Sequence, residues 1–152
     1  MATNRLMISN IIFCEDDEDD RFLFKDVLDD FDSKVKVEFV SHGLRLMELL
    51  KHYIPDLLFL DLEMPFKNGL ECLVEIRGDA TLENLPVIMF SSTTRQANIQ
   101  TAYDLGAHLF LIKSSIFSEY ASSIRAVLQL DWSNPNAIKE QYCVNGRYAA
   151  FS

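Results

Sequence analysis

The chain has 152 residues, of which 49% are hydrophobic and 24% charged, a balance typical of one globular domain with a hydrophobic core. Its net charge of −9 argues against nucleic-acid binding, because neutralising phosphates requires clustered lysine and arginine. The sequence has no apolar run of about 18 residues that could span a membrane, and its N-terminus MATNRLMISN lacks the apolar core of a secretory signal. Its 3 cysteines form no CxxC pair, which indicates free thiols in a reducing cytoplasm.

The first third of the chain alternates strand-like and helical patterns. Residues 11–14 are apolar and predict a strand, with Cys14 buried in it. Residues 21–31 follow as a helix, because their apolar positions recur at spacings of three and four. Asp19 or Asp20 is expected to cap that helix. Residues 35–40, VKVEFV, alternate apolar and polar side chains, as a half-exposed edge strand does.

The same alternation continues through the middle of the chain. A helix is expected over residues 44–53, and a continuous apolar strand over 56–60. The breakers of the turn MPFKNG separate that strand from a helix over residues 70–77. A polar loop is expected over residues 78–84, and the apolar run VIMF predicts a fourth strand over 87–90.

The last part of the pattern predicts a helix over residues 95–105 that Gly106 ends, a strand over 109–112 and a long helix over 116–130. Strands that are apolar throughout, each followed by a helix, are typical of a parallel sheet covered on both faces. We therefore predict a doubly wound, five-stranded α/β domain of the flavodoxin-like type. The alternating second strand favours an edge position, in the strand order 2-1-3-4-5.

The stretch CEDDEDDR places six consecutive carboxylates directly after the first strand. Blocks of like charge are usually solvated segments, but in an open α/β sheet the carboxyl ends of the strands form the ligand-binding edge. We expect Glu15 and Asp16 to face that edge, with Asp17 as the nearest competitor if the register differs by one residue. The acids at 18–20 are interpreted as loop and helix-start residues.

Polar residues also follow the third, fourth and fifth strands. Asp61, Ser91 and Lys113 stand there, and separately they could be a turn acid, a helix cap and a solvated lysine. Together with Glu15 and Asp16 they should converge in one crevice, since the carboxyl ends of parallel strands share one edge. Clustered carboxylates need a cation, and Mg²⁺ prefers such oxygen ligands. A carboxylate beside Mg²⁺ can attack phosphorus, while Lys113 and Ser91 stabilise the transferred oxygens.

The motifs IIFCED, LLFLDLEMPFKNG, LPVIMFSS and GAHLFLIKS resemble, in order and spacing, the receiver domain of two-component response regulators in its stand-alone form. The resemblance covers residues 8–130. It implies that Asp61 accepts the phosphoryl group as an aspartyl phosphate and that Lys113 contacts that group. It also implies a Mg²⁺ site to which Asp61 contributes, in which Asp16 is a direct ligand, Glu15 acts through water and Glu63 contributes its backbone carbonyl.

The same resemblance implies a switch in which Ser91 moves toward the phosphoryl group and Phe110 repositions into the space that Ser91 leaves. Ser114 follows Lys113 where the family commonly has a cis-proline, and a non-proline cis bond costs about 3–4 kcal/mol, so the geometry of this bond stays open. The readout is expected on the face formed by the fourth helix, fifth strand and fifth helix.

The resemblance predicts a cytoplasmic phosphorelay protein that acts as a signalling switch and not as an enzyme. A histidine kinase or phosphotransfer protein would be the phosphoryl donor, and an unknown downstream protein would receive the signal. Neither nucleic acid nor a membrane is expected as a partner, and the protein could form a homodimer. Two alternatives are a Mg²⁺-dependent phosphatase that uses Asp61 with Glu63 as a second acid, and a receiver-like interaction module that works without phosphorylation.

Residues 131–152 are interpreted as a C-terminal extension, too short for a separate output domain. Asn134 and Pro135 are typical of a helix start, which predicts a short helix over residues 136–142. The pair Asn145-Gly146 is typical of a hairpin turn. The sequence leaves open whether this extension is a frayed terminus or a segment for docking or dimerisation.

Overall fold

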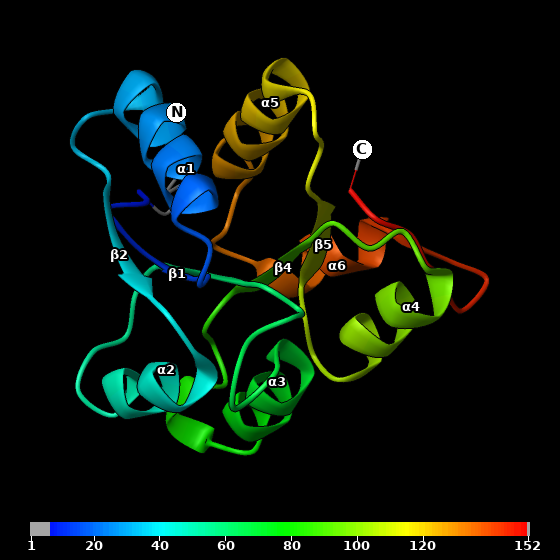
Figure 1. Ribbon diagram of the computed structural model, residues 1–152. Coiled ribbons are helices and arrows are strands. Elements are labelled where there is room, and N and C mark those ends of the chain that lie inside the picture. The colour runs from blue at the N-terminus through cyan, green and yellow to red at the C-terminus, as the bar shows by residue number, and fades with distance from the viewer. Residues whose placement is uncertain (1–6, 152) are drawn as a thin grey trace, which may run out of the picture.

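The structure, a computed structural model, describes residues 7–151. Residue 152 and residues 1–6, which belong to the N-terminal segment MATNRLMISN, lie outside the described part. Five parallel strands form the central sheet (Figure 1), in the order β2-β1-β3-β4-β5. They are β1 (Asn10–Cys14), β2 (Lys36–Val40), β3 (Leu57–Leu60), β4 (Val87–Ser91) and β5 (Leu109–Ile112). The predicted fold class and strand order are confirmed.

Helices cover both faces of this sheet, as predicted. One face carries α1 (Glu18–Phe31) and α5 (Phe117–Leu128), and the other carries α2 (Gly43–Leu50), α3 (Gly69–Arg77) and α4 (Gln96–Asp104) (Figure 1). Because successive side chains of a strand point to opposite faces, the central strands supply both halves of the core. The edge strand β2 keeps alternate residues partly exposed, which agrees with its alternating sequence.

The start of α1 differs from the prediction. The helix begins at Glu18, and its cap is Asp17, whose side chain accepts hydrogen bonds from the backbone N–H groups of Asp19 and Asp20. The expectation that Asp19 or Asp20 caps the helix is therefore wrong. The capping carboxylate comes earlier, so three acids occupy the first turn, where the positive end of the helix dipole stabilises them.

Two other boundaries also differ in detail. The helix α2 ends at Leu50, before Tyr53, and the predicted loop over residues 78–84 contains a 3₁₀ turn, η1 (Ala80–Leu82). Gly106 follows α4 with a φ of 113°, a left-handed backbone conformation that glycine adopts without strain. This confirms the predicted helix end.

The C-terminal extension folds into α6 (Pro135–Gln141) and a hairpin of β6 (Cys143–Val144) and β7 (Arg147–Tyr148). The Asn134 side chain caps α6, and the turn residues Asn145 and Gly146 have φ values of 53° and 77°. Two consecutive positive φ values are what a type I′ hairpin turn requires. Both local predictions are confirmed, whereas the division of the chain at residue 130 stays a prediction.

Over residues 7–151, each helix is too short or too polar to reach across a lipid bilayer.

Candidate functional site

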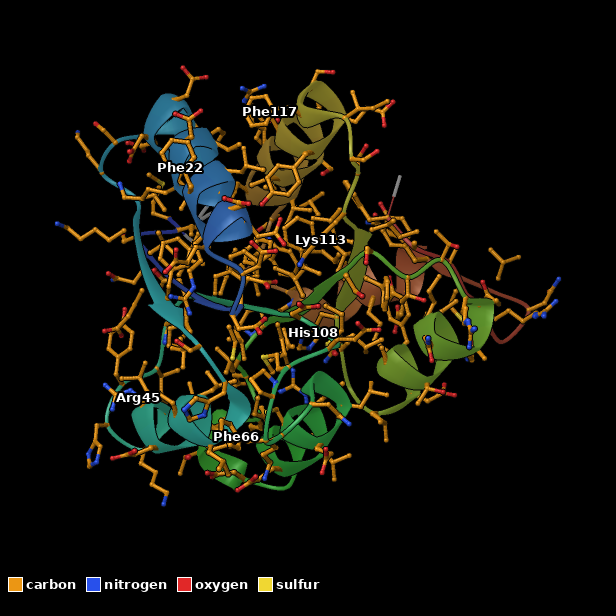
Figure 2. The ribbon with its side chains drawn as sticks, in the orientation of Figure 1. Phe22, Arg45, Phe66, His108, Lys113 and Phe117 are labelled. Carbon is orange, nitrogen blue, oxygen red and sulfur yellow. The ribbon has the colours of Figure 1, made fainter. Side chains whose placement is uncertain are left out.

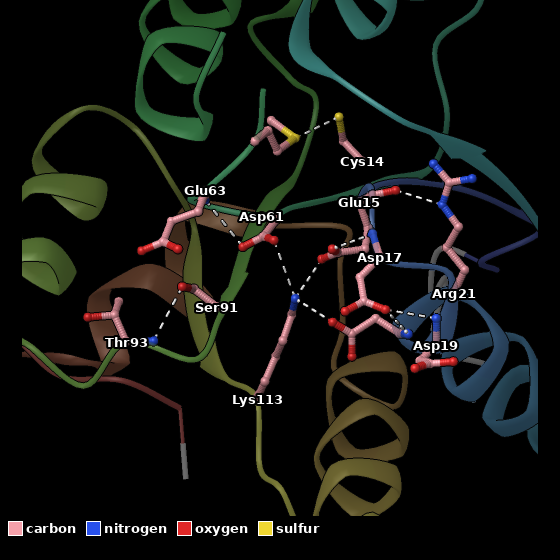
Figure 3. Close-up of polar contacts among 12 residues, drawn as sticks. Cys14, Glu15, Asp17, Asp19, Arg21, Asp61, Glu63, Ser91, Thr93 and Lys113 are labelled. Atoms are coloured by element: carbon pink, nitrogen blue, oxygen red, sulfur yellow. Dashed lines mark hydrogen bonds and ion pairs between the residues drawn. The ribbon is translucent and has the colours of Figure 1, made fainter. Parts of the chain in front are cut away.

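The polar residues that follow the strands converge at the carboxyl ends of the strands. Lys113 follows β5 near the centre of the view in Figure 2, and its side chain extends toward the carboxylates that follow β1 and β3 (Figure 3). They line one groove, whose walls include Glu15, Asp16, Asp17, Asp20, Asp61, Glu63, Ser91 and Lys113. The parallel sheet produces this arrangement because all its strands end at the same edge.

The Lys113 ammonium lies at the centre of the site and contacts three carboxylates. Its Nζ atom is 2.6 Å from Glu15 Oε2, 3.0 Å from Asp20 Oδ2 and 3.4 Å from Asp61 Oδ2. Burial alone would lower the pKa of Lys113, but the Asp61 and Glu15 carboxylates outweigh that effect and raise the pKa to about 12. Lys113 therefore stays an ammonium ion at neutral pH.

One lysine does not balance the negative charge of this groove. Carboxylate oxygens of Glu15, Asp16 and Asp61 lie within 4.8 Å of one another. Burial raises the pKa of the Glu15 carboxyl to about 7, and the adjacent Asp61 adds to the rise, against the opposing effect of Lys113. Such a set of oxygen ligands with excess negative charge suits a hard divalent cation. The donor set thus fits the Mg²⁺ that the sequence predicts.

The loop between β1 and α1 holds the acidic pair in place. Arg21 donates from Nε to the Glu15 carbonyl at 2.6 Å and from its terminal guanidinium nitrogen to Ser41 Oγ at 2.8 Å. The Glu15 side chain is 2% exposed and accepts a hydrogen bond from the Asp17 N–H at 3.0 Å. Glu15 is therefore fixed inside the groove, while Asp16 is exposed at its open side.

The loop after β3 passes close to the Asp61 backbone. A Cβ atom at Gly69 would lie 2.2 Å from the Asp61 carbonyl oxygen, so only glycine permits this approach. The Glu63 N–H lies 3.4 Å from Asp61 Oδ1, which places Glu63 at the rim of the groove. At the outer side of the same loop, Phe66 is 80% exposed with a φ of 67° (Figure 2).

The two predicted switch residues lie in different surroundings. Ser91 is buried at the groove, and its Oγ atom accepts a hydrogen bond from the Thr93 N–H at 3.3 Å (Figure 3). Phe110 is fully buried in the core and does not line the groove. Its N–H donates to the Tyr103 hydroxyl at 3.0 Å. The structure thus brings Ser91 to the other site residues and places Phe110 in the layer behind them.

Sequence reasoning missed one member of the site. Asp20 was interpreted as an ordinary helix-start acid, but its carboxylate binds Lys113. Local sequence gave no signal for this role, because Asp20 lies in the first turn of α1, where acids are common. The bond between Lys113 and Ser114 is trans, as are all peptide bonds in the part of the chain that the structure describes.

Comparison with known proteins agrees with this geometry. The family model of the response regulator receiver domain matches residues 11–125. The Regulator of RpoS of Escherichia coli K12 is 35% identical over 115 residues, which cover 73% of this chain and 32% of that protein. This chain thus spans about a third of the length of that relative. Response regulator Rcp1 of Synechocystis sp. is 25% identical over 124 residues, covering 77% of this chain and 84% of Rcp1.

Solved structures give the same result. The phosphorylated cyanobacterial phytochrome response regulator RcpA superposes with a TM-score of 0.77 at 28% identity, covering 83% of this chain and 95% of the RcpA chain. The Mn²⁺-bound form of Rcp1 superposes with a TM-score of 0.72 at 25% identity, covering 78% and 91% of the two chains. This chain therefore has the same fold as these two response regulators.

Proposed function

Because this chain belongs to the response regulator receiver domain family, we propose that it is a single-domain response regulator that accepts a phosphoryl group on Asp61. The observation that carries this proposal is the position of Asp61, with Lys113 Nζ 3.4 Å from its carboxylate and two further carboxylates beside it. Rcp1 and DivK of Brucella ovis, of which the matched regions cover 84% and 98%, are both named response regulators, which supports a role in two-component signalling.

The chemistry proposed for Asp61 is nucleophilic attack on phosphorus. One carboxylate oxygen of Asp61 forms the new P–O bond, the bond from phosphorus to the donor's nitrogen breaks, and that nitrogen keeps the electron pair. Lys113 stabilises the negative charge on the transferred oxygens, because its pKa keeps it protonated. Glu15, Asp16 and Asp61, with the Glu63 carbonyl, would hold Mg²⁺, which when bound neutralises charge on the phosphoryl oxygens.

The proposed switch follows from a change of partners around the new group. In the described arrangement the Ser91 hydroxyl accepts from the Thr93 N–H, and Lys113 is shared among three carboxylates. The oxygens of an aspartyl phosphate would offer the Ser91 hydroxyl a charged acceptor, which makes a stronger hydrogen bond, and would offer Lys113 an acceptor with more negative charge than a carboxylate. Movement of Ser91 would change the packing around Phe110 and so bias the face formed by α4, β5 and α5.

The proposal includes the setting in which such a switch works. The donor is a histidine kinase or phosphotransfer protein in the cytoplasm, and the signal leaves through contacts with a downstream protein or within a homodimer. The chain takes part in its own phosphoryl transfer without turning over a separate substrate, which distinguishes it from the phosphatase alternative. Receiver-domain relatives such as Rcp1 and DivK, both named response regulators, support this setting.

Incubation of the protein with acetyl phosphate and Mg²⁺ tests the proposal. We expect one phosphoryl group that base and hydroxylamine remove, as they do from an acyl phosphate, on the wild type and none on Asp61→Asn, because the amide is not a nucleophile. Asp19→Asn is the matched control, since Asp19 is an exposed acid outside the groove. Undiminished label on Asp61→Asn would contradict the assignment, and steady hydrolysis of p-nitrophenyl phosphate that depends on Asp61 would favour the phosphatase.

A further inference from the structure

The C-terminal hairpin is held on α4 by side chains of that helix. We call residues 143–151 the C-terminal strap; in Figure 1 it runs beside α4 and returns toward β5. Gln100 accepts a hydrogen bond from the Tyr148 N–H at 2.8 Å, and Gln96 donates to the Tyr148 carbonyl at 2.6 Å. Gln100 also donates to the Gly146 carbonyl at 3.4 Å. Two glutamines one turn apart thus pair with the backbone of the strap.

A second contact joins the strap to the core through two tyrosines. The Tyr148 ring stacks on Tyr103 with a centroid distance of 4.5 Å and an interplanar angle of 13°. Tyr103 is fully buried, and its hydroxyl accepts the hydrogen bond from the Phe110 N–H. From α6, Lys139 donates to the Tyr103 carbonyl at 2.8 Å. Tyr103 therefore links the extension directly to the backbone of the predicted switch aromatic.

A third contact lies on the free edge of the sheet. The strand β5 is an edge strand, and edge strands carry backbone groups that need partners. The strap supplies one of them, because the Phe151 N–H donates to the Phe110 carbonyl at 2.8 Å. Phe110 thus has its N–H bound to a residue that the strap covers and its carbonyl bound to the strap itself.

The same elements flank the phosphoryl-accepting groove. In the register of β4 and β5, Met89 lies opposite Phe110 and Ser91 lies opposite Ile112, the residue before Lys113. The helix α4 follows Ser91 after a short loop, which the Thr93 N–H ties to the Ser91 hydroxyl. The anchors of the strap are therefore on the two elements that movement of Ser91 and Lys113 would displace.

We propose that the C-terminal strap is an intramolecular occupant of the α4–β5 edge, docked in the arrangement described here and released when Asp61 is phosphorylated. This inference rests on the proposed function. The contacts of the C-terminal strap with Gln100, Tyr103 and Phe110 stabilise the arrangement in which Ser91 is paired with Thr93. A segment that binds one of two arrangements shifts the equilibrium toward it, and the coupling is reciprocal. Phosphorylation would thus open the β5 edge to a partner.

Hydrogen exchange of the full chain, followed by NMR with and without acetyl phosphate and Mg²⁺, tests the release directly. We expect the amides of Tyr148 and Phe151 to exchange about fivefold faster or more in the phosphorylated protein, a typical size for coupling between sites. The amides of β3, which lie far from the strap in the sheet order, should keep their protection. Fully phosphorylated protein with unchanged exchange at both strap amides would overturn the coupling while leaving the proposed function intact.

The reciprocal experiment uses variants that loosen the strap. Gln100→Ala removes two of its hydrogen bonds and Tyr148→Ala removes the stacked ring. Each should raise the apparent affinity for beryllofluoride, an analogue of the phosphoryl group, by about fivefold in the presence of Mg²⁺. Arg147→Ala, an exposed residue of the same hairpin, is the matched control and should leave the affinity unchanged.

The outcomes separate the two proposals. Equal beryllofluoride affinity in wild type, Gln100→Ala and Tyr148→Ala would overturn the coupling, and reduced affinity in both variants would reverse its direction and overturn release. A wild type that takes up neither acetyl-phosphate label nor beryllofluoride would overturn the proposed function and the coupling with it.

Discussion

The two ends of the sheet each hold a long cationic side chain, and the two cations are paired in different ways. At the carboxyl end, Lys113 contacts the carboxylates of three different elements. At the opposite end, Arg77 donates to the backbone carbonyls of Gly106 at 2.9 Å and Leu85 at 2.8 Å, and also to that of Leu82 at 3.2 Å. One cation is held by charges, the other by peptide groups.

The partners at the opposite end are fixed and neutral. His108 accepts a hydrogen bond on Nδ1 from the Val87 N–H at 3.1 Å, with Arg77 3.3 Å away on the same nitrogen. Burial lowers the pKa of His108 to about 3, and the nearby Arg77 charge acts in the same direction. Gly106 is also part of this packing, since a Cβ atom there would lie 2.5 Å from the Arg77 side chain.

The difference indicates which end of the molecule can change. Backbone carbonyls are neutral and do not titrate, so Arg77 keeps these partners and is a structural anchor for the loops that precede β4 and β5. Carboxylates can exchange one cation for another or take up a proton, so Lys113 can change partners while the fold persists. Four measurements can test this contrast.

Replacing Arg77 should destabilise the protein more than replacing Lys113. Arg77→Met should lower the free energy of unfolding by about 3 kcal/mol, because several backbone carbonyls lose their donor. Lys113→Met should cost about 1 kcal/mol, because the Glu15 carboxyl, whose pKa is already raised, can take up a proton instead. Urea unfolding at pH 7 measures both. A larger loss in Lys113→Met than in Arg77→Met would refute the contrast.

Lowering the pH should reduce the free energy of unfolding through His108, which lies beside Arg77. The unfolded chain takes up a proton on this residue below about pH 6.5, whereas the folded protein does so only near pH 3. Lowering the pH through this window therefore favours the unfolded state, by about 2 kcal/mol at pH 5. His108→Asn keeps an acceptor without the titration, so its unfolding free energy should fall less between pH 7 and 5. His52→Asn, at an exposed histidine, should behave as wild type.

Mg²⁺ should raise the free energy of unfolding by binding the carboxylates at the carboxyl ends of the strands. At ten times its dissociation constant, a ligand that binds only the folded state adds about 1.4 kcal/mol to the unfolding free energy. Thermal unfolding with and without MgCl₂ measures this gain. It should be largely lost in Asp16→Asn and kept in Asp19→Asn, which removes the same charge outside the groove. Equal gains in both variants would argue against the acidic pair.

The smallest effect separates two neighbours within the acidic block. Asp17→Ala should lower the unfolding free energy by about 1 kcal/mol, because α1 loses its cap, but it should keep the Mg²⁺ response. Asp17→Asn retains a capping oxygen and should restore the stability. If Asp17→Ala instead abolished the Mg²⁺ response, the pair would have to be shifted by one residue to Asp16 and Asp17.

Much of the candidate site followed from local patterns. Asp61, Ser91 and Lys113 were found because each directly follows an apolar strand, and strand order alone places such residues at one edge. Asp20 was missed because a helix-start acid and a site acid have the same local sequence. Its role depends on the length and direction of the Lys113 side chain, which comes from the far end of the chain.

The five parallel strands, their alternation with helices and the hairpin turn at Asn145-Gly146 could be predicted from local patterns, because they depend on hydrophobic spacing and on backbone preferences of single residues. The stacking of Tyr148 on Tyr103 and the hydrogen bond from the Phe151 N–H to the Phe110 carbonyl could be seen only in the folded structure. Contacts of this kind join segments distant in the chain, and no local pattern encodes which buried surface an amphipathic segment will cover.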